Sequence, residues 1–175
     1  MEIAIIDKNT IKVKTKKTTF IIDPIASTPK TPADAILLLQ KSKGDLQRVT
    51  DYRLVIDGPG EYELGGVKIS AFKIDGKLAY GLIGDGVETV IGESSVLNKL
   101  ADKFQEKTIA VINMDEDLNE SVITTIEPKI VIFYGEKASE GVKSVGKDPA
   151  GVEKTKKINI AENKMPEEMQ VAILQ

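Results

Sequence analysis

The side chains that most often carry hydrolytic and metal chemistry are missing from this chain, which contains no histidine and no cysteine. Imidazole is the commonest metal ligand and the side chain whose ordinary pKa lies nearest to neutral pH. Its absence excludes a Ser-His-Asp triad, a Cys-His pair and an ordinary zinc site. Any chemistry must therefore come from Asp, Glu, Lys, Tyr, Ser or Thr side chains.

Three patterns begin like known motifs but lack essential members. Ser-x-x-Lys occurs only in predicted loops and strands, whereas its chemistry needs a helix start. Gly92-Glu93-Ser94-Ser95 starts like a nucleophile elbow but lacks the last glycine, so we interpret Ser94 and Ser95 as helix caps. Residues 115–119 have the acidic start of a calcium loop without its glycine and glutamate. We interpret them as acidic residues that precede a helix and favour its N-terminal dipole.

Composition indicates one globular domain that binds neither nucleic acid nor membrane. The 175 residues are 41% hydrophobic and 29% charged, and we interpret residues 1–175 as a single domain. A formal net charge of −3, with 22 lysines against 2 arginines, disfavours a nucleic-acid binder. No stretch reaches the roughly 18 apolar residues of a membrane span, and the first residues do not resemble a signal peptide. We therefore expect a cytoplasmic protein.

Short strands are predicted through the first half of the chain. Apolar runs and period-two alternation indicate strands at residues 3–6, 10–14, 18–22, 35–39, 54–56, 67–72, 78–83 and 89–91. The run 35–39 is apolar throughout, which is typical of a strand buried on both faces. Asp75-Gly76 is a predicted hairpin turn. Residues 27–32 contain two prolines and are predicted to form a loop without regular pairing.

Helices are predicted only in the second half, where they alternate with strands. We expect helices from Ser94 or Ser95 to residue 106 and over 119–126, and strands over 108–112, 129–134 and 170–174. Residues 135–157 are rich in Gly and Lys and are predicted to be a mobile loop. The first half of the chain thus contains only predicted strands, and the second half contains strands and helices. This order favours an α+β fold with two facing sheets and helices outside.

The string Ile56-Asp57-Gly58-Pro59-Gly60-Glu61-Tyr62-Glu63, followed by Gly66-Val67, resembles a segment of the metallo-β-lactamase superfamily. It is most similar to the small bacterial members described as zinc-dependent hydrolases. Further segments with the same resemblance follow the family's order at residues 18–24, 33–38, 127–132 and 165–168. The likeness spans nearly the whole chain. It implies a compact four-layer αββα sandwich with a two-metal hydrolytic site.

The same resemblance implies that the metal ligands have been lost. The superfamily's His-x-His-x-Asp-His motif, bridging aspartate and final histidine fall on Gln40, Ser42, Gly44, Asp45, Glu93 and Gly135. Only Glu93 and Asp45 keep ligand character, and two carboxylates hold at most a weakly bound hard cation. We expect these six former metal-site positions to converge at one edge of the sandwich. Glu93 and Asp45 would then repel each other unless Lys41 or Lys43 compensates.

These observations predict a non-catalytic pseudoenzyme that keeps the hydrolase scaffold and serves as a binding or assembly module. We assign no catalytic, metal-ligating or cofactor-binding residue and expect no cofactor. The partner is a protein or a small molecule that the sequence does not identify, and homo-oligomerisation stays open. Two alternatives remain. One is a divergent, magnesium-dependent hydrolase that uses Glu93, Asp45 or Lys41 as acid or base. The other is a small-ligand sensor that uses the former substrate cleft.

Overall fold

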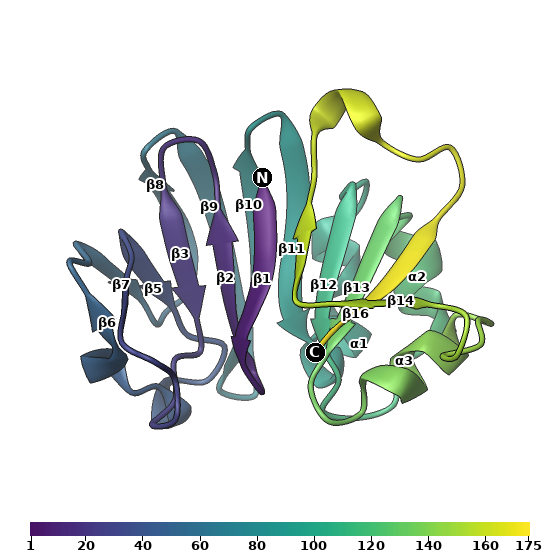
Figure 1. Cartoon of the computed structure of the whole chain (residues 1–175), viewed down its shortest axis with the longest axis horizontal. Coiled ribbons are helices and arrows are strands. Elements are labelled where there is room, and N and C mark those ends of the chain that lie inside the picture. Colours follow the sequence, from purple (N-terminus) through teal and green to yellow (C-terminus); the bar gives the residue numbers. More distant parts are fainter.

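Two β-sheets face each other in the computed structural model, which describes residues 1–175 (Figure 1). The first sheet contains β1 (Glu2–Asp7), β2 (Thr10–Lys14), β3 (Thr19–Ile22), β5 (Ala35–Leu37), β7 (Leu54–Ile56) and β15 (Lys157–Asn159). Its strand order is β15-β1-β2-β3-β5-β7. Neighbours are antiparallel from β15 to β3, and β3, β5 and β7 are parallel.

The second sheet has eight strands in the order β14-β16-β13-β12-β11-β10-β9-β8. Their bounds are β8 (Gly60–Leu64), β9 (Val67–Ile74), β10 (Lys77–Gly84), β11 (Val87–Glu93), β12 (Ile109–Asn113), β13 (Ile130–Tyr134), β14 (Glu153–Thr155) and β16 (Gln170–Leu174). Strands β8 to β11 form antiparallel hairpins, whereas β11, β12 and β13 are parallel. The carboxyl ends of these parallel strands therefore meet at one edge of the sheet.

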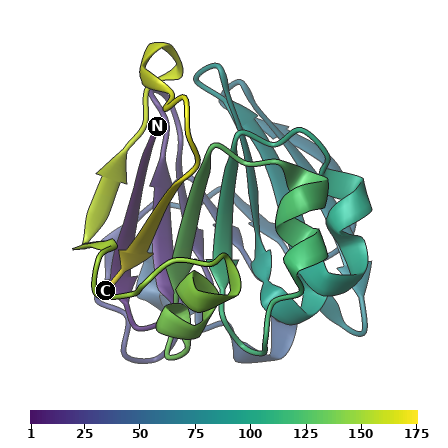
Figure 2. The same ribbon diagram turned by 90° about the vertical axis from the view of Figure 1, so that its right-hand side faces the viewer.

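Three short α-helices cover the outer face of the eight-stranded sheet (Figure 2). They are α1 (Ser94–Leu100), which continues into the 3-10 helix η3 (Ala101–Phe104), α2 (Glu120–Ile126) and α3 (Ala138–Ser144). The other sheet has no α-helix outside it. Its outer face packs against the 3-10 helix η2 (Leu46–Arg48) and a ribbon of β4 (Thr31–Pro32) and β6 (Val49–Thr50), and a further 3-10 helix, η1 (Lys41–Lys43), precedes η2. A fourth 3-10 helix, η4 (Glu162–Lys164), precedes β16, and none of the helices is long and apolar enough to cross a lipid bilayer.

The main core lies between the two sheets and contains 24 buried residues. The alternation of side chains along β9 shows how the sequence builds it, because Val67, Ile69 and Ala71 are buried whereas Lys68 between them is exposed. A second cluster of 16 residues joins the helices to the eight-stranded sheet. The sheet with helices on it is thus apolar on both faces, which explains the continuous apolar runs of β12 and β13.

Most of the predicted elements are confirmed, including the hairpin at Asp75-Gly76 and the complete burial of residues 35–39. The loop predicted over 27–32 is wrong at its end, since β4 pairs with β6 in a parallel ribbon. Pro32 is tolerated there because the ribbon has only two strands of two residues each and needs few ladder hydrogen bonds.

The mobile loop predicted over 135–157 is also wrong, because this segment contains α3, β14 and the first residue of β15. Ala138 and Val142, one helical turn apart, are buried against the sheet in the same cluster as Phe133. Gly141 lies between them and permits the close approach, since a Cβ there would come 2.5 Å from Phe133 Cδ1. A glycine that suggested a loop therefore serves helix packing.

Candidate functional site

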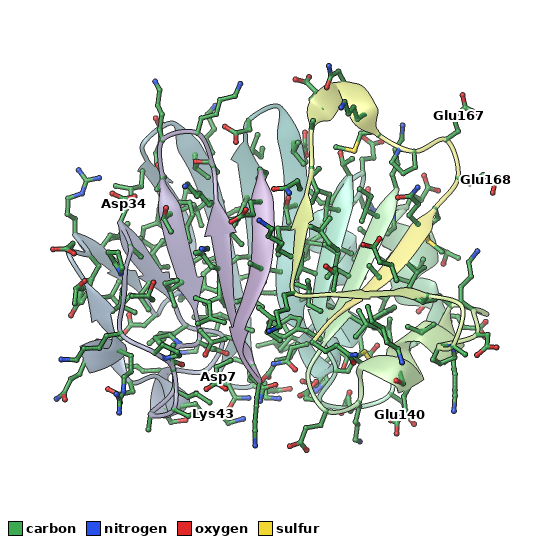
Figure 3. The ribbon with its side chains drawn as sticks, viewed as in Figure 1. Asp7, Asp34, Lys43, Glu140, Glu167 and Glu168 are labelled. Atoms are coloured by element: carbon green, nitrogen blue, oxygen red, sulfur yellow. The ribbon has the colours of Figure 1, made fainter.

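Polar side chains gather where the parallel strands of the two sheets end. Asp23 follows β3, Gln40 lies three residues beyond β5, and Glu93 is the last residue of β11. Asp115 follows β12 and Gly135 follows β13. This is the lower edge of the sandwich in Figure 3, where Lys43 and Asp7 are labelled. The carboxyl ends of parallel strands are common positions for ligand sites.

The ammonium group of Lys77 lies between two carboxylates at this edge. Its Nζ is 2.7 Å from Glu93 Oε2 and 2.6 Å from Asp115 Oδ2, and it donates to Ser95 Oγ at 2.9 Å. Gln40 Nε2 completes the cluster by donating to both oxygens of Glu93 at 2.8 Å. The Glu93 side chain is only 4% exposed. A buried carboxylate is thus paired with an internal cation and a neutral amide.

The backbone fixes Lys77 in this position. Lys77 begins β10 directly after the turn at Asp75 and Gly76, whose φ angles of 50° and 79° are typical of a tight hairpin. Gln40 and Lys77 form an isolated antiparallel bridge, and the Leu78 N–H donates to the Leu39 carbonyl at 2.8 Å. The end of one sheet is therefore tied to the start of a strand in the other at the point where the ion pairs form.

Asp115 also caps helix α1 from outside the helix. Its Oδ1 accepts hydrogen bonds from the Ser95 N–H at 3.0 Å and from Ser94 Oγ at 2.9 Å, and its Oδ2 accepts from Ser95 Oγ at 2.6 Å. The sequence interpretation was wrong on this point. The two serines donate to Asp115 instead of capping the helix themselves, and Asp115 serves α1 although it precedes α2 in the chain.

Both partners of this ion pair have a shifted pKa. Burial opposes the charged form of Lys77, but the hydrogen bonds to Asp115 and Glu93 outweigh it and raise the Lys77 pKa above its usual value. Burial likewise opposes ionisation of Asp115, yet its hydrogen bonds with Lys77, Ser95 and Ser94 hold its pKa well below the usual range. Lys77 and Asp115 are therefore both charged at neutral pH and compensate each other.

Asp23 is a second buried carboxyl group at the same edge, and it makes no ion pair although Lys43 lines the same cavity. It is 6% exposed, and its Oδ1 accepts the Leu39 N–H at 2.7 Å. Burial raises the Asp23 pKa to about 7 and the nearby Glu93 charge adds to this, against the opposing effects of backbone hydrogen bonds and Lys43. Asp23 takes part in no ion pair.

The hydroxyl of Tyr134 is buried close to Asp23 and has no hydrogen-bond partner of good geometry, although the neighbouring Asn113 side chain lowers its pKa. Burial raises the Tyr134 pKa, and the neighbouring charges of Asp23 and Glu93 raise it further. Tyr80, the other fully buried tyrosine, differs in this respect. Its hydroxyl lies 2.6 Å from the Leu38 carbonyl oxygen and 2.9 Å from that of Ile56, so it is satisfied by the backbone. Buried polar groups without a partner are rare in proteins.

A cavity of about 230 Å³ opens beside these groups. Its lining includes Asn9, Asp23, Ile25, Lys43, Glu93, Asn113, Met114, Asp115, Glu136 and Lys137. Asp23, Glu93 and Asn113 are buried in its interior, whereas Lys43, Glu136 and Lys137 are exposed. The cavity thus has an acidic and amide interior with charged side chains of both signs outside it.

Three of the six former metal-site positions lie at this cavity or beside it. Gln40 and Glu93 are in direct contact. Gly135 adjoins them through Asn113, because a Cβ at Gly135 would come 2.5 Å from Asn113 Oδ1. The φ of 91° at Gly135 is also unfavourable for other residues.

The other three positions lie in the segment around η1 and η2. Ser42 is exposed, and Gly44 packs against Leu38. Asp45 accepts a hydrogen bond from the Gln47 N–H at 3.2 Å and pairs with Arg48 at 3.4 Å, and none of its hydrogen bonds is to Glu93. The carboxylate that faces Glu93 is therefore Asp23, and the compensating cation is Lys77. Lys41 instead pairs with Asp57 at 2.7 Å.

The carboxylates at this edge are directed at a cation of the protein itself. No group of three or more His, Cys, Asp or Glu residues in the chain could hold a metal ion. Glu93 and Asp115 direct oxygens to the Lys77 ammonium, which lies where a cation between them would have to lie. No sequence pattern singled out Lys77, Asp23 or Tyr134 as site residues. The Asp-Pro that ends β3 was the available signal for Asp23, but Lys77 and Tyr134 gave none.

Comparison with solved structures identifies the fold. No protein-family model matches the sequence, and no curated protein sequence matches it. A Thermotoga maritima protein, assigned as a Zn-dependent hydrolase of the metallo-β-lactamase superfamily, shares 17% identity at a TM-score of 0.74, with 99% of this chain and 98% of that chain covered. A protein from Parabacteroides distasonis, assigned as a metal-dependent hydrolase, shares 16% identity at a TM-score of 0.60, covering 83% and 90%.

A third similar structure is the isothiocyanate hydrolase from Delia radicum gut bacteria, with 10% identity and a TM-score of 0.57 over 100% of this chain and 97% of that chain. These similarities extend over most or all of the chain. The chain therefore has the mixed α+β fold of the metallo-β-lactamase superfamily. The three similar proteins named above are described as hydrolases.

Proposed function

We propose that this chain is a non-catalytic member of the metallo-β-lactamase fold that acts as a binding or assembly module. The observation that carries the proposal is the position of the Lys77 ammonium, within 2.7 Å of Glu93 and 2.6 Å of Asp115. Glu93 is the residue that the sequence resemblance aligned with the bridging aspartate of a metal centre. A side chain of the protein itself thus supplies the positive charge that this carboxylate needs.

The donor set argues against the metal that the fold implies. Zinc sites are built from thiolate, imidazole and carboxylate ligands, of which only carboxylates are present here. The two carboxylates nearest each other across Lys77 would have to lose their ammonium before they could ligate an ion. Beyond these two carboxylates, a metal would find only the Asp23 carboxyl group, whose pKa is raised, and neutral groups such as the Gln40 amide. These residues do not fit a tightly held catalytic metal ion.

The remaining groups do not form a metal-free hydrolytic site either. Glu93 accepts from Gln40 and Lys77, so a proton taken up by Glu93 would weaken three interactions. Ser94 and Ser95 are the nearest hydroxyl groups, and both donate to Asp115, a carboxylate whose depressed pKa makes it a weak base. An activated nucleophile needs a stronger base within hydrogen-bond reach.

Hydrolysis assays on phosphodiesters, lactones and β-lactams test the proposal. We expect rates at background for the wild-type protein, with and without added Zn²⁺, Mn²⁺ or Mg²⁺. Glu93→Gln is the matched control, because it removes the only carboxylate at an aligned ligand position in direct contact with Lys77. Turnover that follows the protein peak through purification and disappears in Glu93→Gln would establish the divergent hydrolase instead.

A further inference from the structure

A second cavity, of about 580 Å³, lies at the edge of the sandwich opposite to the Lys77 cluster. Its lining includes Ile130 and Gln170, the first residues of β13 and β16, whereas Glu93 is the last residue of β11. These strands run in the same direction, so the two sites lie at opposite ends of them. We propose that this cavity binds the anion of a medium-chain fatty acid. The inference goes beyond the proposed loss of catalysis and does not depend on it.

The cavity lies where both sheets end, and its walls are therefore apolar. The terminal strands β14 and β15 both contribute to its lining. Ile130 and Ile160 are buried members of the cluster between the sheets. Met169 and Val171 pack against the cluster beneath the helices. The space thus adjoins both hydrophobic clusters, and a hydrocarbon chain placed in it would be removed from water.

The size of the cavity fits a small organic ligand. Sites for such ligands typically have volumes of about 300–1,000 Å³, mostly apolar walls and a few polar groups that fix the orientation. Eight of the fifteen residues that line this cavity are hydrophobic. The connection from β15 to β16, which contains η4, runs round the opening (Figure 1). The cavity therefore has the character of a binding site for a largely apolar molecule.

The charged side chains of the lining favour an anionic head group. Lys147, which follows α3, and Lys164 in η4 are exposed and take part in no ion pair. Glu153 is the only carboxylate in the lining, so the lysines outnumber it. Glu167 and Glu168 point away from the molecule (Figure 3), and neither lines the cavity. A ligand carboxylate beside the two lysines would keep its charge in water while its chain is buried.

Calorimetric titration of the full chain with sodium decanoate, combined with amide chemical shifts, tests the proposal. A saturable Kd of about 0.1 mM is expected for a ligand of this size. The largest shifts should occur at Ile130, Ile158 and Val171, whereas Leu39 and Asn113 at the opposite edge should not shift. Octanoate should bind about 10-fold more weakly, because two buried methylene groups are removed.

Two further probes separate the contributions of the head group and the chain. Acetate carries the carboxylate without the chain and should not bind. Decyltrimethylammonium carries the same chain with a cationic head group and should bind at least 10-fold more weakly than decanoate. Equal binding of the cation would show that the lysines select no anion and would overturn the proposal.

The double variant Lys147→Gln with Lys164→Gln should weaken decanoate binding by about 5–10-fold, because both partners of the carboxylate are removed. The double variant Lys43→Gln with Lys137→Gln makes the same change of charge at the opposite edge and should leave the affinity unchanged. Equal losses in the two double variants, no saturable heat with wild type, or shifts centred on Leu39 and Asn113 would also overturn the proposal. The hydrolysis assays are unaffected by any of these results, so the proposed function is tested separately.

Discussion

Two buried polar clusters lie at the same edge of the sandwich, and they differ in how completely their groups are satisfied. In the Lys77 cluster, formed by Lys77, Glu93, Asp115 and Gln40, every charged group has an oppositely charged partner and hydrogen bonds. In the Asp23 cluster, formed by Asp23 and Tyr134, one carboxylate has no cation and one hydroxyl has no partner. The first arrangement pairs its charges within the protein, whereas in the second burial raises the pKa of an unpaired carboxyl group to about 7.

The largest expected effect is the loss of stability on removing Lys77. Lys77→Met leaves Glu93 and Asp115 as neighbouring carboxylates without their cation, which typically costs about 3–5 kcal/mol for a buried pair. Partial exposure of Lys77 places the expected value at the lower end of that range. Chemical denaturation at neutral pH measures it. The double variant Lys77→Met with Glu93→Gln should recover part of the loss.

Lys99→Met is the matched control for this comparison. Lys99 pairs with Asp75 at 2.6 Å in the same region, but both side chains are more than half exposed. Exposed ion pairs contribute little to stability, so no measurable change is expected. Similar losses for Lys77→Met and Lys99→Met would show that the Lys77 cluster has no special structural role.

The Asp23 cluster should produce a dependence of stability on pH with the opposite sign to that of a paired carboxylate. The folded pKa of about 7 lies above the ordinary value of 3.8, so the folded state binds more protons between these pH values. The contribution of Asp23 therefore favours folding at low pH and is lost as the pH rises from about 4 to about 7.

Unfolding free energies of wild type and Asp23→Asn across this pH range isolate the effect. The difference between the two proteins should shift steadily in favour of Asp23→Asn as the pH rises to 7, and stay constant above it. A difference that does not change with pH would mean that Asp23 ionises normally, and the two clusters would then not differ in the way described.

The two buried tyrosines give the smallest and most direct contrast. Tyr80→Phe removes hydrogen bonds to the Leu38 and Ile56 carbonyls and should destabilise the protein by about 1–3 kcal/mol. Tyr134→Phe removes a hydroxyl that has no partner and should be neutral or stabilising by up to about 1 kcal/mol. Thermal unfolding of both variants measures the contrast. Equal losses would indicate that the Tyr134 hydroxyl is already satisfied.

The sheets were predictable because their signals are local. Alternation along β2 and β9 and the apolar runs of β12 and β13 follow directly from which faces are buried. Helix α3 was not predictable in this way. Its stability depends on Ala138 and Val142 packing against the sheet, and Gly141 reads as a loop signal unless the neighbouring Phe133 is known.

Site residues were predictable only where the family resemblance aligned a metal-ligand position with the end of a predicted strand. Gln40, Glu93 and Gly135 could be placed because each follows or ends a recognisable strand. Lys77 is one of 22 lysines, and only the pairing of two sheets brings it to Glu93 and Asp115. The mutual position of Asp23 and Tyr134 has the same origin, since they come from different sheets.

The central claim is that Lys77 holds the cation position of this fold. The most direct test is elemental analysis of the purified protein, followed by calorimetric titration with Zn²⁺, Mn²⁺ and Mg²⁺. The account predicts no stoichiometric metal in the wild-type protein and no saturable binding heat. About one metal ion per chain, bound in the wild type and lost in Glu93→Gln, would contradict the account.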